Sequence, residues 1–150
     1  MPTMFILSQK SNLKGTIDVP GSKSHTIRGV FFASLAEGAS VLERPLDSLD
    51  TLAAVDACRA FGAEIVTAPE WRIKGFAGSP QVPTNIVDVL NSGTTLNIAL
   101  SVAALVDGYT VLTGDEQIRR RPAGPLIKAL VALGAEAFAT RANGCPPIVV

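Results

Sequence analysis

The chain has 150 residues, of which 47% are hydrophobic and 17% charged, and thirteen Lys and Arg residues balance thirteen Asp and Glu residues. This composition excludes a disordered chain, and the zero net charge argues against a general nucleic-acid binder. No apolar run is long enough to cross a bilayer, and the first ten residues lack the pattern of a signal peptide. We therefore expect a folded, cytoplasmic protein whose partners include neither nucleic acid nor a membrane.

The first half of the chain alternates between strand-like and helix-like segments. Residues 13–19 alternate in polarity and end at a Pro-Gly turn, which favours a strand. Ser24 is a plausible N-cap for the helix that follows. In chain order we expect a strand at Leu13–Val19, a helix at Ser24–Glu37, a strand at Ser40–Leu42, a helix at Ser48–Phe61, and a strand pair at 63–67 and 71–76.

The second half repeats this order, with a helix from Gly93 to about Val106, a strand at 109–113, a helix from near Pro122 to 133, and strands at 135–140 and 148–150. Gly21 and Gly93 precede matching helices, and Gly62 and Gly134 end the next ones, with a spacing of 72 residues in both cases. The sequence therefore predicts an α+β fold made of two α/β repeats. Each repeat is a βαβαββ unit, at about 13–80 and about 85–150.

The two cysteines and the apolar end of the sequence narrow the range of possible functions. The cysteines, Cys58 and Cys145, are isolated and give neither a disulfide framework nor the ligand spacing of a metal site. The chain ends in the apolar run Ile148–Val150, whereas a natural C-terminus is usually polar and exposed. We therefore expect no metal, and we expect the chain to be a segment of a longer protein.

The densest polar cluster lies where the first strand meets the first helix. Lys23, Ser24 and Arg28 follow Gly21 there, and Ser24 and Arg28 project from one face of the helix. Backbone N–H groups and the positive end of a helix dipole favour an anion at such a turn. The alternative is an ordinary capped helix with two solvated cations, and the residue types leave both interpretations open.

The second unit carries a similar cluster, Asn91-Ser92-Gly93-Thr94-Thr95, at the equivalent helix start. Gly93 would let a ligand approach the backbone closely, although ordinary capping explains the same residues. The only basic run is Arg119-Arg120-Arg121, and successive side chains cannot all point to one ligand. Asp47 and Asp50 flank another helix start, where capping by Ser48 or Asp50 is favoured over catalysis.

Taken in order, these motifs resemble the 5-enolpyruvylshikimate-3-phosphate (EPSP) synthase family. The resemblance runs from about Leu13 to Gly134 and covers roughly the N-terminal third of such an enzyme. It is carried by Pro20-Gly21-Ser22-Lys23-Ser24 with Arg28, by Leu46-Asp47-Ser48, by Asn91-Ser92-Gly93-Thr94-Thr95, and by Thr113-Gly114-Asp115 with Arg121-Pro122.

The resemblance implies a reaction and a fold. The family transfers the enolpyruvyl group of phosphoenolpyruvate to the 5-hydroxyl of shikimate 3-phosphate and releases phosphate, in the shikimate pathway of aromatic amino acid biosynthesis. It uses no cofactor, and its helices pack inside against sheets. The implied catalytic residues are Lys23 and Arg121, which contact phosphoenolpyruvate. Ser24 and Arg28 would hold shikimate 3-phosphate, while Asn91, Gly93 and Thr94 would line a site that glyphosate also occupies.

The sequence departs from the family's pattern at one position and lacks the family's later part. Asn97 stands where the family usually has Arg, which removes one cation. The proton-transfer residues lie beyond this segment, so catalysis would need the remainder of the enzyme in cis or a complementing chain. We therefore expect the 150-residue chain alone to be inactive.

Two alternatives remain. The related UDP-N-acetylglucosamine enolpyruvyl transferases carry a reactive Cys before their Arg-Pro pair, whereas residues 114–121 contain none. That family also favours Asn where this chain has Ser24. The other alternative, from a different class, is a non-catalytic anion-binding or assembly domain.

Overall fold

The computed structural model describes residues 4–150, and the first three residues of the expected 1–150 segment lie outside the described residues. Helices and short strands alternate along the chain. In order they are α1 (Lys23–Leu35), β1 (Ala39–Leu42), α2 (Leu49–Ala60), β2 (Glu64–Thr67), β3 (Trp71–Lys74), β4 (Val87–Asp88), α3 (Gly93–Ala103), β5 (Val111–Thr113), the 3-10 helix η1 (Ile118–Arg120), α4 (Gly124–Ala132), β6 (Phe138–Ala139) and β7 (Ile148–Val149).

Serine side chains cap the first three α-helices. Ser22 accepts a hydrogen bond from His25 N at the start of α1, so the expectation that Ser24 is the N-cap was wrong. The cause is the extended backbone of Ser22, which lets its hydroxyl reach the first turn and leaves Ser24 inside the helix. Ser48 caps α2 in a capping box with Thr51, and Ser92 caps α3.

Two sheets that share a three-strand order, the second with one strand more, confirm the predicted α+β fold. The first has the order β1-β3-β2 with antiparallel pairs, and the second has the order β4-β5-β7-β6. Strands β5, β7 and β6 correspond to β1, β3 and β2, while β4 pairs in parallel with β5. The second half therefore forms the predicted βαβαββ unit, and its first strand is the two-residue strand β4, where no strand was assigned from the sequence.

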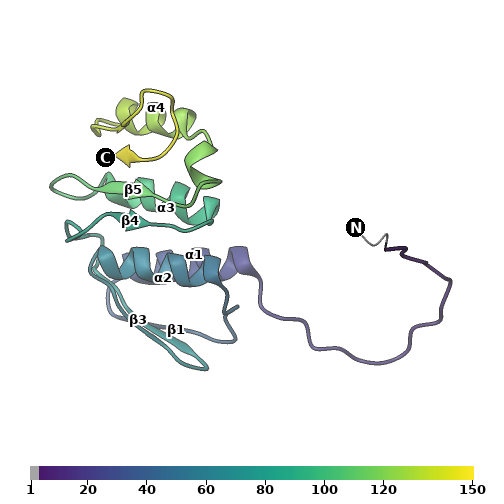
Figure 1. The fold of residues 1–150 in the computed structure, drawn as a ribbon. Helices are drawn as coiled ribbons and strands as arrows, with labels where there is room; N and C mark the ends of the chain where they lie inside the picture. Colours follow the sequence, from purple (N-terminus) through teal and green to yellow (C-terminus); the bar gives the residue numbers. More distant parts are fainter. Residues whose placement is uncertain (1–3) are drawn as a thin grey trace.

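The strand expected at Leu13–Val19 is absent, so that prediction was wrong. This segment is extended but forms no ladder, and Leu13 is 92% exposed. Figure 1 shows the purple N-terminal segment running away from the folded body. A strand requires a neighbour with which to exchange hydrogen bonds, and none of the strands within residues 4–150 pairs with it. Alternating polarity does not reveal whether such a neighbour exists.

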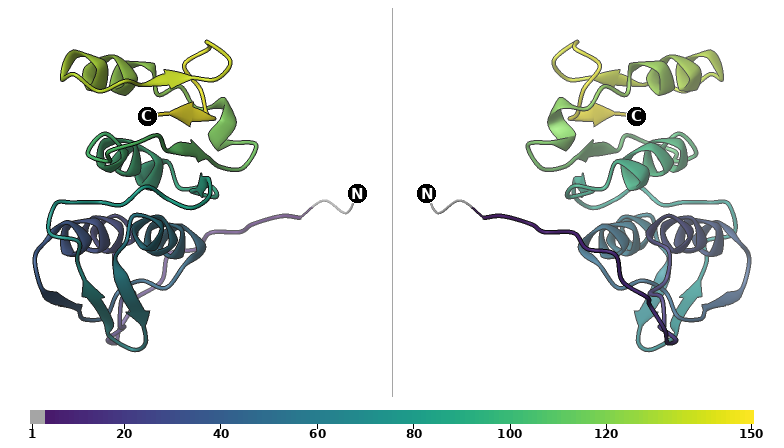
Figure 2. Two further views of the ribbon diagram at one scale, coloured as in Figure 1. Left: turned by 90° about the vertical axis from the view of Figure 1, so that its left-hand side faces the viewer. Right: turned by 90° about the vertical axis from the view of Figure 1, so that its right-hand side faces the viewer.

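Helices α1, α2 and α3 form the middle of the molecule. Helices α1 and α2 lie side by side over one face of the first sheet, and α3 lies beyond them towards the second sheet (Figures 1 and 2). One apolar cluster runs through both halves of the chain and includes Phe31, Phe61, Leu100, Leu112 and Ile148. Helix α4 lies at the far end, with Leu130 as its buried residue. This packing brings the first turns of α1, α2 and α3 together.

Candidate anion-binding site

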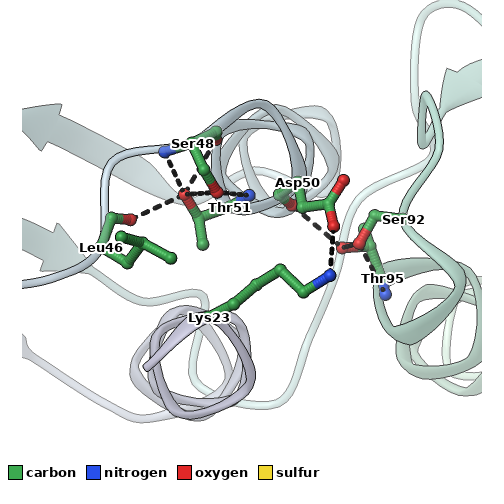
Figure 3. Close-up of polar contacts among 7 residues, drawn as sticks. All are labelled: Lys23, Leu46, Ser48, Asp50, Thr51, Ser92 and Thr95. Atoms are coloured by element: carbon green, nitrogen blue, oxygen red, sulfur yellow. Dashed lines mark hydrogen bonds and ion pairs between the residues drawn. The ribbon is translucent and has the colours of Figure 1, made fainter. Parts of the chain in front are cut away.

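The N-termini of α1, α2 and α3 meet at one place, which we call the three-helix site. Lys23 is the first residue of α1, Asp50 the second of α2 and Gly93 the first of α3. Figure 3 shows the Lys23 side chain crossing from α1 towards Asp50, with Ser92 and Thr95 of the third helix start beside them. Because each helix N-terminus carries partial positive charge and free N–H groups, this junction favours an anion.

Lys23 and Asp50 form an ion pair across this junction. Lys23 Nζ lies 2.6 Å from Asp50 Oδ2, and the Lys23 side chain is 52% exposed while that of Asp50 is 23% exposed. The ammonium is therefore held in place at one side and open at the other. The local sequence does not reveal this role for Asp50, because the pairing joins residues 27 positions apart. Of the two predicted capping residues, Ser48 is the cap.

Ser92 and Thr95 link the third helix to the second. Their hydroxyl oxygens lie 2.7 Å apart, and Ser92 Oγ accepts a hydrogen bond from Thr95 N at 3.3 Å. The Thr95 hydroxyl is 3.5 Å from the carbonyl oxygen of Asp50, to which it donates. Both residues are buried, so these contacts fix the start of α3 against the start of α2.

Arg121 lies against Gly93. A Cβ atom placed on Gly93 would be 2.6 Å from Arg121 Nη1, so only glycine leaves room for the guanidinium in this position. The two residues come from motifs 28 positions apart in the chain. Their contact places an exposed guanidinium beside the first N–H groups of α3.

The three consecutive arginines point to three different partners, as their spacing predicted. Arg119 donates to the carbonyl oxygen of Gly114, and Arg120 pairs with the carboxylate of Glu116. Arg121 is left beside Gly93. The run lies in and just after η1 and precedes α4, so these cations do not oppose the dipole of α4 in its first turn.

The remaining predicted residues lie on α1, on α3 or in the turn before α3. Arg28 Nη1 donates to the carbonyl oxygen of Ser24 at 3.2 Å, so both residues share one face of α1 as predicted. Asn91 is exposed in the turn before α3, and Thr94 is half-buried in the first turn. Asn97 is exposed one turn further along α3. The structure thus places Lys23 with Asp50, Ser24 with Arg28, and Gly93 with Arg121.

The site suits anionic ligands with separate charged groups. Lys23, Arg28 and Arg121 can each bind a phosphate or carboxylate oxygen, and arginine can do so with two parallel hydrogen bonds. Residues 4–150 contain no group of three or more His, Cys, Asp and Glu side chains that could hold a metal ion. In the same residues, no helix combines the length and the apolar character needed to cross a membrane.

The clear pKa shifts belong to groups that take no part in these contacts. Burial raises the pKa of the Cys58 thiol to about 12. The hydrogen bond to Glu64 raises the pKa of Lys74, and the bond to Glu136 raises that of Tyr109. At neutral pH all three groups therefore keep their protons.

Two units that share the element order αβαββ, the second with β4 as an additional first strand, define an α+β protein. A family model described as EPSP synthase (3-phosphoshikimate 1-carboxyvinyltransferase) matches residues 7–150. The chain therefore belongs to the EPSP synthase family.

Similar proteins support the same assignment. The chain is 51% identical over 148 residues to a 3-phosphoshikimate 1-carboxyvinyltransferase of Ruminiclostridium cellulolyticum, and 53% identical over 148 residues to one of Acetivibrio thermocellus. In both cases 98% of this chain aligns with 35% of the relative. A solved EPSP synthase from Acinetobacter baumannii superposes with a TM-score of 0.84 and 30% identity, over 91% of this chain and 32% of that chain. The chain thus spans about a third of the length of these relatives.

Proposed function

We propose that the chain forms part of the substrate-binding half of a 3-phosphoshikimate 1-carboxyvinyltransferase. In this reaction the enolpyruvyl group of phosphoenolpyruvate is transferred to the 5-hydroxyl of shikimate 3-phosphate, and inorganic phosphate leaves. The observation that carries the proposal is a chain of contacts between helix starts. Lys23 of α1 pairs with Asp50 of α2, and Asp50 also accepts a hydrogen bond from Thr95 in the first turn of α3 (Figure 3). Gly93, the first residue of α3, in turn contacts Arg121. The relatives' names and the family match support the same reaction.

The proposed roles follow from charge and position. Lys23 and Arg121 bind phosphoenolpyruvate, stabilise the charge that develops as phosphate leaves, and act as the catalytic residues of this segment. Ser24 and Arg28 hold shikimate 3-phosphate on the shared face of α1. Asn91, Gly93 and Thr94 line the site, where glyphosate would compete with phosphoenolpyruvate. Holding both anions side by side supplies proximity.

Proton transfer needs the remainder of the enzyme, in cis or as a complementing chain. The reaction requires no cofactor. A cytoplasmic location fits two free cysteines, of which Cys58 is buried. Neither cysteine lies in the loop 114–121, which argues against a UDP-N-acetylglucosamine enolpyruvyl transferase.

A ligand titration tests the proposal. We expect phosphoenolpyruvate and shikimate 3-phosphate, at millimolar concentration, to shift amide NMR signals at the starts of α1 and α3. Lys23→Ala should weaken phosphoenolpyruvate binding about tenfold, because a hydrogen bond to a charged group is lost. Lys74→Ala is the matched control, because Lys74 is also an exposed lysine paired with one carboxylate. The absence of shifts at either helix start, or equal losses in both variants, would contradict the proposal.

A turnover assay separates the enzyme fragment from the non-catalytic alternative. The chain alone should release no phosphate from the two substrates. Addition of the missing part of the enzyme as a second chain should restore phosphate release, and Lys23→Ala should abolish it. A reconstituted mixture that binds both ligands but never releases phosphate would instead support an anion-binding or assembly domain.

A further inference from the structure

Two buried threonines hold the backbone of Leu46 from opposite sides. Thr26, in α1, accepts a hydrogen bond from Leu46 N at 3.0 Å through its hydroxyl. Thr51, in α2, donates its hydroxyl proton to the carbonyl oxygen of Leu46 at 2.7 Å. Thr26 is 6% exposed and Thr51 is fully buried. One residue between the helices is therefore tied to both of them.

Leu46 also lies tightly against the turn that starts α1. A Cβ atom on Gly21 would be 2.7 Å from the carbonyl oxygen of Arg44 and 2.9 Å from Leu46 N. Lys23 follows Gly21 by two positions, and Asp50 follows Leu46 by four. The position of Leu46 thus sets how the start of α2 lies against the start of α1, and with it the distance between Lys23 and Asp50.

We propose that Thr26 is a positioning residue for the three-helix site. Its hydroxyl touches no ligand but holds Leu46, and Leu46 holds the start of α2 so that the Asp50 carboxylate meets the Lys23 ammonium. A flexible lysine that is already held in the binding geometry loses less conformational freedom when the anion arrives. This inference deepens the proposed function and rests on it.

The substitution that tests this role is Thr26→Val. Valine has the shape of threonine but cannot accept the hydrogen bond, so Leu46 N is left without its acceptor. Thr26→Ser restores the acceptor and should therefore rescue the site. Thr110→Val is the matched control, because Thr110 is equally buried and its hydroxyl has no hydrogen-bond partner within the described residues.

The first measurement needs no ligand. NMR relaxation of the lysine ammonium groups in the 150-residue chain reports how firmly each ion pair is held. In Thr26→Val we expect the Lys23 ammonium to become more mobile, while that of Lys74, paired with Glu64 at 2.8 Å, stays unchanged. Thr26→Ser and Thr110→Val should behave like the original chain. Unchanged mobility of Lys23 in Thr26→Val would overturn the proposal.

The second measurement is phosphoenolpyruvate affinity in a double-mutant cycle. Thr26→Val should weaken binding about tenfold, as expected when one hydrogen-bonded contact is lost, and should have almost no effect when Lys23→Ala is also present. If Thr26→Val weakened phosphoenolpyruvate binding equally in the original chain and in Lys23→Ala, its effect would be a general structural one, and the proposal would be overturned. Should Thr26→Val fail to fold, judged by thermal melting, Thr26→Ala takes its place in both measurements.

The outcomes separate this inference from the function on which it rests. If Lys23→Ala weakens binding and Thr26→Val does not, the positioning role is wrong and the proposed function stands. If Lys23→Ala leaves binding intact, the proposed function fails. The mobility of the Lys23 ammonium then still decides whether Thr26 positions the ion pair.

Discussion

Gly93 decides how closely Arg121 approaches the start of α3. Its missing side chain leaves room for the guanidinium, since a Cβ atom there would come within 2.6 Å of Arg121 Nη1. The atom that would clash is the end of a flexible side chain, so the guanidinium can move while the helix stays. A substitution at Gly93 therefore acts on the ligand site more than on the fold.

We expect Gly93→Ala to weaken phosphoenolpyruvate binding about tenfold, because the displaced Arg121 loses a charge-assisted contact. Stability should be unchanged or slightly higher, since alanine is the better helix residue by about 1 kcal/mol. Gly124→Ala is the matched control, because Gly124 also starts a helix and a Cβ atom there meets nothing within 4 Å. Ligand titration and thermal melting measure both effects. Loss of affinity in the control, or none in Gly93→Ala, would contradict the role of Gly93.

At the scale of elements, the sequence predicted most helices and few of their contacts. Gly62 and the serine at position 48 marked the ends of α2 correctly, because capping is a local property. The strand at Leu13–Val19 was wrong and β4 was missed, because a strand exists only through a partner. The roles of Asp50 and Thr26 were missed for the same reason: each depends on a distant residue.

At the candidate site, too, local motifs were predictable from the sequence and contacts between distant residues were not. The motifs predicted Lys23, Gly93 and Arg121 as site residues, and helical spacing predicted that Ser24 and Arg28 share a face. No spacing within either motif indicates that Arg121 lies over Gly93. That contact depends on how η1 packs after β5, and hence on the tertiary fold.

The contact between Tyr109 and Glu136 joins the segment before β5 to the segment after α4. Tyr109 donates a hydrogen bond to the Glu136 carboxylate at 2.6 Å, and this bond, together with the negative charge, raises the pKa of the phenol. A raised pKa in the folded state means that the contact stabilises the fold fully below the unfolded pKa. The contribution is lost as the pH rises through the folded pKa.

We expect Glu136→Ala to lower the midpoint of phenol ionisation towards the ordinary value, because both the hydrogen bond and the charge are removed. Since the chain has one tyrosine, the phenolate absorbance reports this group alone. Glu70→Ala, at an exposed glutamate beside β3, is the control and should leave the midpoint unchanged. The loss of stability in Glu136→Ala should also disappear at a pH above the raised pKa. Identical titrations for Glu136→Ala and the original chain would contradict the contact.

At the scale of the whole molecule, one core joins the two repeated units. Leu100 of α3 is fully buried in the same apolar cluster as Trp71 of β3, although Trp71 belongs to the first unit and Leu100 to the second. Helix α3 contacts both α1 and α2, so the second unit packs on the helices of the first. A shared core predicts that the two units unfold together.

Leu100→Ala tests this coupling, because it removes buried side-chain volume from the second unit while the only tryptophan reports on the first. We expect a destabilisation of about 2–5 kcal/mol from lost burial and the remaining cavity. In urea, the Trp71 fluorescence transition should shift by the same amount as the circular-dichroism transition of the helices. Leu133→Ala is the control, since Leu133 is 85% exposed and should change stability little. A tryptophan transition that stays in place while part of the helical signal melts earlier would show that the two units unfold independently.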